Sequence, residues 1–92
     1  MILSFQDRDT RQLYETGKSR RFSAISRVAI RKLIQLDEAI VLNDLSVPPG
    51  NRLEALQGDL LGLHSIRIND QWRICFCWNG SHAEHVAIRD YH

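Results

Sequence analysis

Hydrophobic and polar residues alternate strictly between Trp72 and Trp78. The apolar positions are Trp72, Ile74, Phe76 and Trp78, and Arg73 lies between the first two of them. Strict alternation is typical of a strand with one buried face, because successive side chains point to opposite sides of a sheet. Residues 64–68 alternate in the same way. The two segments predict a β-hairpin that organises the rest of the chain.

The polarity of the two strands selects the length of the turn between them. A two-residue loop would place Arg67 opposite Trp72 and mix polar with apolar positions, since directly opposed residues share a face. A three-residue loop, residues 69–71, sets Arg67 opposite Arg73 instead. Both arginines are therefore predicted on one face, away from the apolar side chains.

Directly opposed arginines repel each other, and such cross-strand pairs are destabilising by up to about 1 kcal/mol. Two interpretations of Arg67 and Arg73 follow. Either both side chains are solvated on an exposed sheet face, or an anion bound between them removes the repulsion. The local pattern leaves both open.

Two helices are predicted ahead of the hairpin. Asp7 or Asp9 can cap the first helix, and Gly17 would end it. The second is predicted over residues 23–42, with Asn43 as its C-cap. Its apolar residues recur every three or four positions, at Ile25, Ala29, Leu33, Leu36 and Ile40.

The remaining strands are predicted from shorter signals. They cover residues 2–5, 52–56 and 84–89. The Pro-Pro-Gly-Asn sequence at residues 48–51 breaks regular structure, and an Asn-Gly pair at residues 79–80 predicts a turn before the last strand. In that last strand Val86 and Ile88 are expected to face the core, which places Arg89 on the side of Arg73.

This order of elements predicts an α+β fold, with two N-terminal helices packed on one face of a mainly antiparallel sheet. The other sheet face is expected to remain open. A chain of 92 residues is long enough for one small core and too short for two. Residues 1–92 are therefore predicted to form a single domain.

The net charge of +1 does not indicate nucleic-acid binding, but the basic residues are unevenly distributed. Residues 18–32 contain six basic side chains and no acid. The candidate RNA or ribosome contacts are Lys18, Arg20, Arg21, Arg27 and Arg31. Either they form an ordinary solvated surface, or they bind phosphates, which attract cations whatever the nucleotide sequence.

Cys75 and Cys77 lie at i and i+2 on one strand face, a spacing that suits neither a strain-free disulfide nor a zinc knuckle. Free thiols in a reducing cytoplasm are expected. No apolar run approaches the roughly 20 residues that span a bilayer, so no membrane association is expected. No metal or cofactor motif is present, and none is predicted.

His92 differs from the other histidines because it lies at the end of the chain. An exposed imidazole with an unperturbed pKa near 6.5 suits proton transfer at neutral pH. The alternative is an incidental tail residue, and composition alone does not decide between them.

Three sequence features carry a resemblance to a known family: PPGNRLEAL, the run GDxxGxHSIRINDQWRICF, and the terminal DYH. Together they resemble the HigB branch of the RelE superfamily of bacterial toxins, over nearly the whole chain. The resemblance implies a RelE-like microbial ribonuclease-type fold and ribosome-dependent cleavage of mRNA in the A site. It also implies a HigA-like helix-turn-helix antitoxin as partner, with operator DNA bound only through the antitoxin complex.

The resemblance places the active site at Arg73 and the terminal residues Asp90, Tyr91 and His92, with Arg67 in the matching hairpin. Where some relatives have a histidine and a lysine before the hairpin, this chain has Glu54 and Gln57. Either this subgroup uses a different acid/base pair, or its activity is weaker.

Cleaving RNA through its own 2′-hydroxyl requires a base, an acid and cations that stabilise the phosphorane. Arg73, with Arg67, is expected to clamp the phosphate, because guanidinium binds phosphate oxygens bidentately. His92 is expected to transfer a proton, and Tyr91 to stack on a base or assist proton transfer. Glu54 is a candidate base and Asp90 a candidate orienting group.

Two other function classes compete with this hypothesis. A non-cleaving inhibitor that binds RNA or the ribosome, and is neutralised by a partner protein, would use the same arginines without needing a terminal histidine. A DNA-binding or structural subunit fits less well, because no helix-turn-helix pattern is visible in the sequence.

Overall fold

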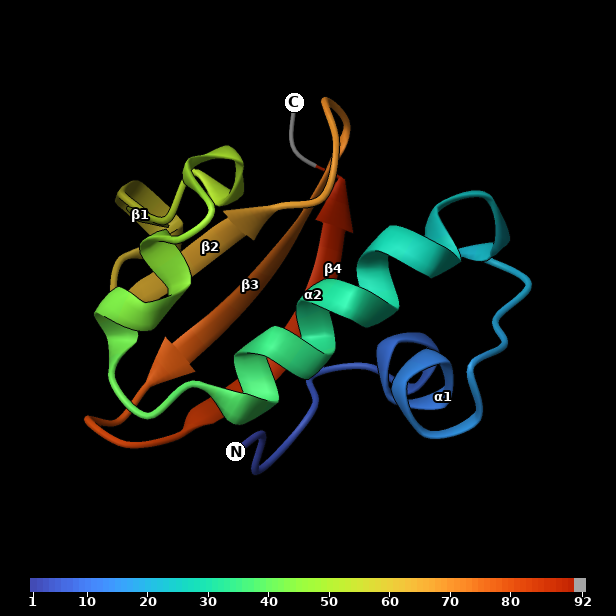
Figure 1. Cartoon of the computed structure of the whole chain (residues 1–92), viewed down its shortest axis with the longest axis horizontal. Coiled ribbons are helices and arrows are strands. Elements are labelled where there is room, and N and C mark those ends of the chain that lie inside the picture. The colour runs from blue at the N-terminus through green and yellow to red at the C-terminus, as the bar shows by residue number, and fades with distance from the viewer. Residues whose placement is uncertain (91–92) are drawn as a thin grey trace.

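A computed structural model describes residues 1–90, in which two helices lie against one face of a four-stranded antiparallel sheet (Figure 1). The helices are α1 (Arg8–Thr16) and α2 (Ser26–Glu38), and the strands are β1 (Glu54–Ala55), β2 (Leu63–Arg67), β3 (Trp72–Trp78) and β4 (Ala83–Asp90). Short 3-10 helices are η1 (Ser23–Ile25), η2 (Leu42–Ser46), η3 (Pro49–Asn51) and η4 (Gly58–Leu60). The strand order β1-β2-β3-β4 follows the chain, and the α+β prediction is confirmed.

Helix α1 begins and ends where the sequence predicted. Asp7 is the N-cap, and its carboxylate accepts a hydrogen bond of 3.1 Å from the backbone N–H of Thr10. Gly17 ends the helix with a φ of 78°, in the left-handed region that favours glycine.

Helix α2 is shorter than predicted, since it ends at Glu38 and Ala39 is extended. The carboxylate of Asp44 accepts hydrogen bonds from the backbone of Ile40 and Val41, which lowers the pKa of Asp44 and holds the chain in a separate turn. Local side-chain bonds of this kind compete with helical hydrogen bonds. The prediction of Asn43 as C-cap was therefore wrong, and Ile40 is 78% exposed rather than in the core.

The core lies between α2 and the sheet. Its fully buried side chains include Leu33, Leu36, Leu45, Ile66, Ile74, Phe76 and Val86. Phe22, just before η1, meets the ring of Trp72 edge to face at 5.5 Å. The apolar face predicted for residues 72–78 is therefore the helix-covered face.

The hairpin has the register that polarity predicted. Arg67 is directly opposite Arg73, and Ile66 is opposite Ile74. The side chain of Asn69 holds the turn by accepting hydrogen bonds of 2.8 Å from the backbone N–H groups of Gln71 and Trp72. This Asx-type bonding closes the three-residue loop without a glycine.

The outer strands are shorter than expected. Strand β1 has only two residues, with Glu54 opposite Ser65 of β2. Residues 2–5 add isolated parallel bridges to β4 rather than a full strand. The pairing of β4 is interrupted by a bulge, where His85 has a φ of 54°.

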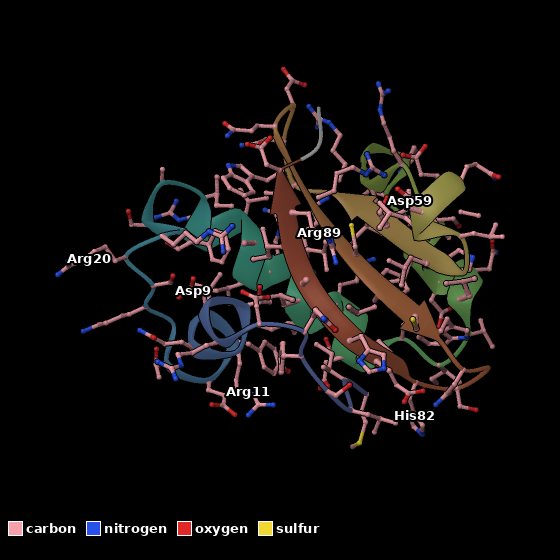
Figure 2. All side chains as sticks on the ribbon, turned by 180° about the vertical axis from the view of Figure 1, so that it is seen from behind. Asp9, Arg11, Arg20, Asp59, His82 and Arg89 are labelled. Carbon is pink, nitrogen blue, oxygen red and sulfur yellow. The ribbon has the colours of Figure 1, made fainter. Side chains whose placement is uncertain are left out.

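The sheet face away from the helices, here called the rear face, is not open as the sequence predicted. Its positions Ser65, Cys75 and Ala87 are buried, and so is Leu56, which follows β1. The segment after β1 lies against this face, and Asp59 marks it in the view from behind (Figure 2). The residues of this covering segment have no periodic hydrophobic pattern from which its position could be predicted. None of the helices in residues 1–90 is long and apolar enough to cross a lipid bilayer.

Candidate active site

Arg73 lies in the middle of the rear face and is only 6% exposed. Its Nε donates a hydrogen bond of 2.7 Å to the hydroxyl of Ser65, and its Nη2 donates one of 2.6 Å to the backbone carbonyl of Arg52. The same nitrogen lies 3.3 Å from a carboxylate oxygen of Glu54. The guanidinium is therefore fixed in position while remaining charged.

The sequence positions these partners from two elements. Ser65 of β2 shares the rear face with Arg73, because the directly opposed pairs of the hairpin alternate between the two faces. Arg52 ends η3 with a φ of 46°, a conformation that non-glycine residues rarely adopt. Strained backbone of this kind is concentrated at functional sites, and here it accompanies the carbonyl that holds Arg73.

Arg67 has a different environment from its neighbour. It is half-buried, and its Nη2 lies 2.5 Å from a carboxylate oxygen of the exposed Asp70 in the turn. Each of the two opposed arginines therefore has its own acidic partner. The interpretation in which both side chains are solvated is wrong, because Arg73 is buried, and the bound anion stays a prediction.

The structure brings Glu54 to Arg73 but leaves its carboxylate about half exposed to solvent. A carboxylate in this position can accept a proton or orient the guanidinium. Gln57 is exposed on the segment that follows. Within residues 1–90, no three His, Cys, Asp or Glu side chains come together as a metal-binding group.

Asp90 ends β4 directly opposite Trp72, at the sheet end that carries the hairpin turn. Its carboxylate accepts a hydrogen bond of 3.1 Å from the side chain of Gln71. The chain thus leaves β4 beside the strand that carries Arg73. Tyr91 and His92, the other two terminal site residues, lie outside the described residues.

The basic residues predicted to contact RNA or the ribosome are all exposed, but they differ in whether they have partners. Lys18, Arg20, Arg27 and Arg31 are exposed. Arg21 is exposed too, but it pairs with Asp9 at 3.4 Å and its guanidinium lies 5.0 Å from the ring centre of Phe22. The cations of this region are therefore available at the surface without the fixed geometry of Arg73.

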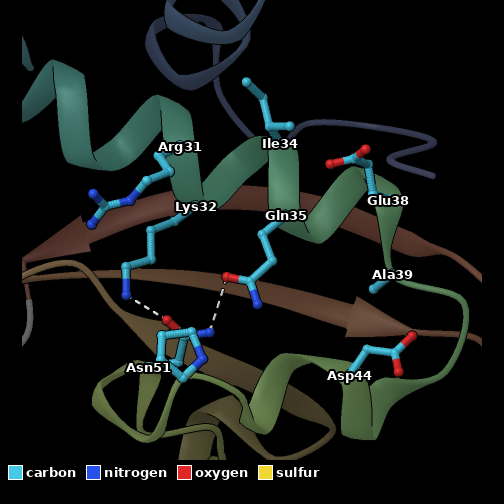
Figure 3. Close-up of a pocket in the computed structure, with 9 residues that line it drawn as sticks. Arg31, Lys32, Ile34, Gln35, Glu38, Ala39, Asp44 and Asn51 are labelled. Atoms are coloured by element: carbon cyan, nitrogen blue, oxygen red, sulfur yellow. Dashed lines mark hydrogen bonds between the residues drawn. The ribbon is translucent and has the colours of Figure 1, made fainter.

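Sequence reasoning missed a buried polar cluster that joins α2 to the site (Figure 3). The ammonium group of Lys32 donates a hydrogen bond to the side chain of the fully buried Asn51, which also donates to Gln35 and to the carbonyl of Leu45. Desolvation lowers the pKa of Lys32, and the charges of Arg31 and Arg67 lower it further. The buried Lys32 of α2 therefore experiences the charge of Arg67 in the hairpin.

A hollow borders this polar cluster, since Lys32, Gln35 and Asn51 also line it. It has a volume of about 570 Å³ and separates α2 from η2 and η3, with Ile34, Ala39 and Pro48 in its walls (Figure 3). Arg73 does not line it. The candidate site is thus centred on a buried arginine of the rear face and lies outside this hollow.

Comparisons with known proteins identify the family of this chain. Residues 3–92 match the family model described as the RelE-like toxin of the type II toxin-antitoxin system HigB. Toxin HigB-1 of Vibrio cholerae serotype O1 is 43% identical over 93 residues, covering 99% of this chain and 94% of that protein. An uncharacterised protein of Haemophilus influenzae is 30% identical over 86 residues, covering 91% of this chain and 85% of that one.

The match includes both the hairpin that holds Arg67 and Arg73 and the terminal residues after β4. It also implies a cognate antitoxin as partner, because toxins of this class act in toxin-antitoxin pairs. On the extent of the family match and the identity to a HigB toxin, the chain belongs to the RelE-like HigB toxins of type II toxin-antitoxin systems.

Proposed function

We propose that this toxin is a ribosome-dependent endoribonuclease that cleaves mRNA in the A site, in line with the endoribonuclease activity general among RelE-like HigB toxins. One observation carries the proposal: the guanidinium of Arg73 is buried, charged and held by Ser65 and the carbonyl of Arg52. Preorganised cations stabilise developing charge without the cost of reorganising during the reaction.

The proposed reaction uses the 2′-hydroxyl of the RNA as the nucleophile. Its oxygen bonds to the adjacent phosphorus while a base removes its proton, and the bond from phosphorus to the 5′-oxygen breaks as an acid protonates that oxygen. The products are a 2′,3′-cyclic phosphate and a 5′-hydroxyl. The protein must therefore supply one base, one acid and cations for the phosphorane, and this chemistry needs no metal.

We assign charge stabilisation to Arg73 and Arg67. Arg67 can exchange Asp70 for a phosphate at low cost, because exposed ion pairs are weak. Glu54, 3.3 Å from Arg73, is assigned as the base or as the group that orients this arginine. His92 is assigned proton transfer, Tyr91 stacking or proton transfer, and Asp90 the orientation of the terminus.

The ribosome supplies the remaining contributions in this proposal. Pairing of the mRNA in the A site would orient the scissile bond, and orientation of reacting groups can lower a barrier by several kcal/mol. The exposed cations Lys18, Arg20, Arg21, Arg27 and Arg31 would contact rRNA phosphates. A HigA-like antitoxin with a helix-turn-helix would neutralise the toxin in the cytoplasm and connect it to operator DNA.

Mapping of RNA ends after induction tests the proposal. Cells that express the toxin should accumulate mRNA fragments with new 5′-hydroxyl ends inside translated codons, and cells that express Arg73→Ala should not. A toxin that stops translation without producing such ends would instead be a non-cleaving inhibitor. The matched control is Arg11→Ala, because Arg11 is an exposed arginine of α1 and not of the sheet (Figure 2).

A further inference from the structure

A third arginine continues the row of arginines across the rear face. Arg89 of β4 is directly opposite Arg73 of β3, as Arg67 of β2 is on the other side. Directly opposed residues share a face, so the three side chains leave the sheet on the same side. Because neighbouring strands lie about 4.8 Å apart, the ends of the row are about 10 Å apart at the backbone.

The three arginines differ in their partners. Arg67 pairs with Asp70 and Arg73 with Glu54. Arg89 is exposed and forms no ion pair with any acid of residues 1–90. The charges of Arg89 and Arg73 both act on the thiol of Cys75, opposing the rise in its pKa that burial causes. The two cations therefore lie close to one point of the rear face.

A hollow of about 340 Å³ opens beside Arg89. Its walls include the side chains of Leu60, Leu63, Cys77 and His85, with Asp59 at the loop that borders it. Figure 2 shows Arg89 over the sheet and Asp59 on the neighbouring segment. His85 reaches this hollow from the bulge in β4, where its backbone N–H donates a hydrogen bond of 2.9 Å to the hydroxyl of Ser4.

The hollow combines a cation, a carboxylate and apolar side chains in different parts of its wall. Arg89 attracts a phosphate at one side, whereas the carboxylate of Asp59 disfavours a second phosphate. Aliphatic side chains and an imidazole offer a surface on which a nucleobase can stack. Asp59 can accept a hydrogen bond from a ribose hydroxyl or a base N–H group. One phosphate with its attached nucleoside matches all of these groups.

We propose that Arg89 and this hollow form a second RNA subsite, in which Arg89 binds a phosphate next to the scissile phosphate and the hollow holds the attached nucleoside. The proposal rests on the proposed function, because it takes Arg73 as the position of the scissile phosphate. It makes Arg89 a positioning residue, which aligns the RNA on Arg73 but does not contact the reacting atoms.

Binding to ribosomes programmed with an uncleavable mRNA tests the subsite. A single 2′-deoxynucleotide at the cleaved position prevents the reaction, and methylphosphonates replace the flanking phosphates one at a time. One methylphosphonate should weaken wild-type binding about five- to tenfold, as expected for loss of a charge-assisted hydrogen bond. Arg89→Gln should lose a similar factor, and the same methylphosphonate should then cost it nothing further.

Matched variants separate this effect from general loss of charge or folding. Arg11→Gln removes the same charge outside the walls of the hollow and should bind as wild type, and Arg89→Lys should recover part of the affinity. Thermal unfolding of Arg89→Gln should match wild type. With cleavable mRNA, Arg89→Gln should raise KM more than it lowers kcat, whereas Arg73→Ala should lower kcat.

Two results would overturn the subsite. One is Arg89→Gln binding as tightly as Arg11→Gln, and the other is additive losses from Arg89→Gln and every methylphosphonate. Cleavage of the all-ribose mRNA by wild-type protein is recorded separately, so failure of the proposed function is seen as absent cleavage even where binding depends on Arg89. No binding of wild-type protein to programmed ribosomes would overturn both.

Discussion

Arg73 and Arg31 carry the same guanidinium group in very different settings. Arg73 is 6% exposed and fixed by Ser65 and the carbonyl of Arg52, whereas Arg31 is exposed to solvent at the border of the hollow beside α2 (Figure 3). A fixed group loses little side-chain entropy on binding and can stabilise one geometry. A solvated cation adapts to many phosphate positions and is screened by salt. In the proposed function, the fixed Arg73 would act at the scissile phosphate, and the solvated cations would add affinity for RNA.

Arg73→Ala should give the largest effect. Cleavage of ribosome-bound mRNA should fall about 10³-fold or more, because the phosphorane loses its fixed cation. Single-turnover cleavage on programmed ribosomes measures this, and raising the pH should not restore the rate. Arg31→Ala, made for comparison, should change cleavage at saturating toxin by less than about threefold. Equal losses in the two variants would remove the distinction between the regions.

Deletion of His92 is expected to give the second-largest loss of cleavage. Loss of one acid/base catalyst typically costs about 10²- to 10⁴-fold in rate. Changes at a chain terminus usually alter the free energy of unfolding by no more than about 0.5 kcal/mol. This variant should therefore lose most of its cleavage rate, whereas its urea unfolding midpoint should stay close to that of wild type. Wild-type cleavage by the deletion variant would move the acid/base roles to Glu54 and Tyr91.

Asn51→Ala should affect stability more than any exposed asparagine. It removes the hydrogen-bond partner of the buried Lys32 ammonium and leaves the carbonyl of Leu45 without this donor. We expect a loss of about 2–4 kcal/mol in the free energy of unfolding. Asn43→Ala, at an exposed position of η2, should stay within about 0.5 kcal/mol. Similar urea midpoints for the two variants would show that the cluster is not needed to join α2 to the site.

Neutralising the exposed cations should have the smallest effect per residue. Replacing Arg20, Arg27 and Arg31 with glutamine should weaken ribosome binding at low salt. It should also reduce the slope of log affinity against log salt by about 0.7–0.9 for each rRNA phosphate that the protein no longer neutralises. Co-sedimentation across a salt series measures both quantities. An unchanged slope would reduce this region to a solvated surface.

The alternation of polar and apolar residues along the two hairpin strands was enough to predict how these strands pair. Arg67 had to face Arg73 once the apolar residues were placed on one side, and the structure has this register. The helix end after Glu38 was missed, because it depends on Asp44 binding a backbone turn that no periodicity indicates.

The polar partners of the site depend on longer-range contacts. Asn51 belongs to a Pro-Gly loop in the sequence, yet it is buried against Lys32 from α2. The cover over the rear face comes from Leu56 and the segment after it, which lacks an alternating pattern. The sequence could have placed only the Ser65 hydroxyl near Arg73, because Ser65 alternates with the buried Ile66 and so lies on the other sheet face.

The edges of the sheet have a consequence for how the toxin associates with other chains. Residues 1–6 cover the outer side of the first half of β4, where they form four backbone hydrogen bonds to Ala83 and Val86. The opposite edge, β1, is only two residues long and carries the charged Glu54. Long unpaired edges are templates for aggregation, and both edges are shortened in these ways. These features disfavour strand-to-strand polymerisation of the toxin, so we expect a binding partner to contact its side chains more than to extend its sheet.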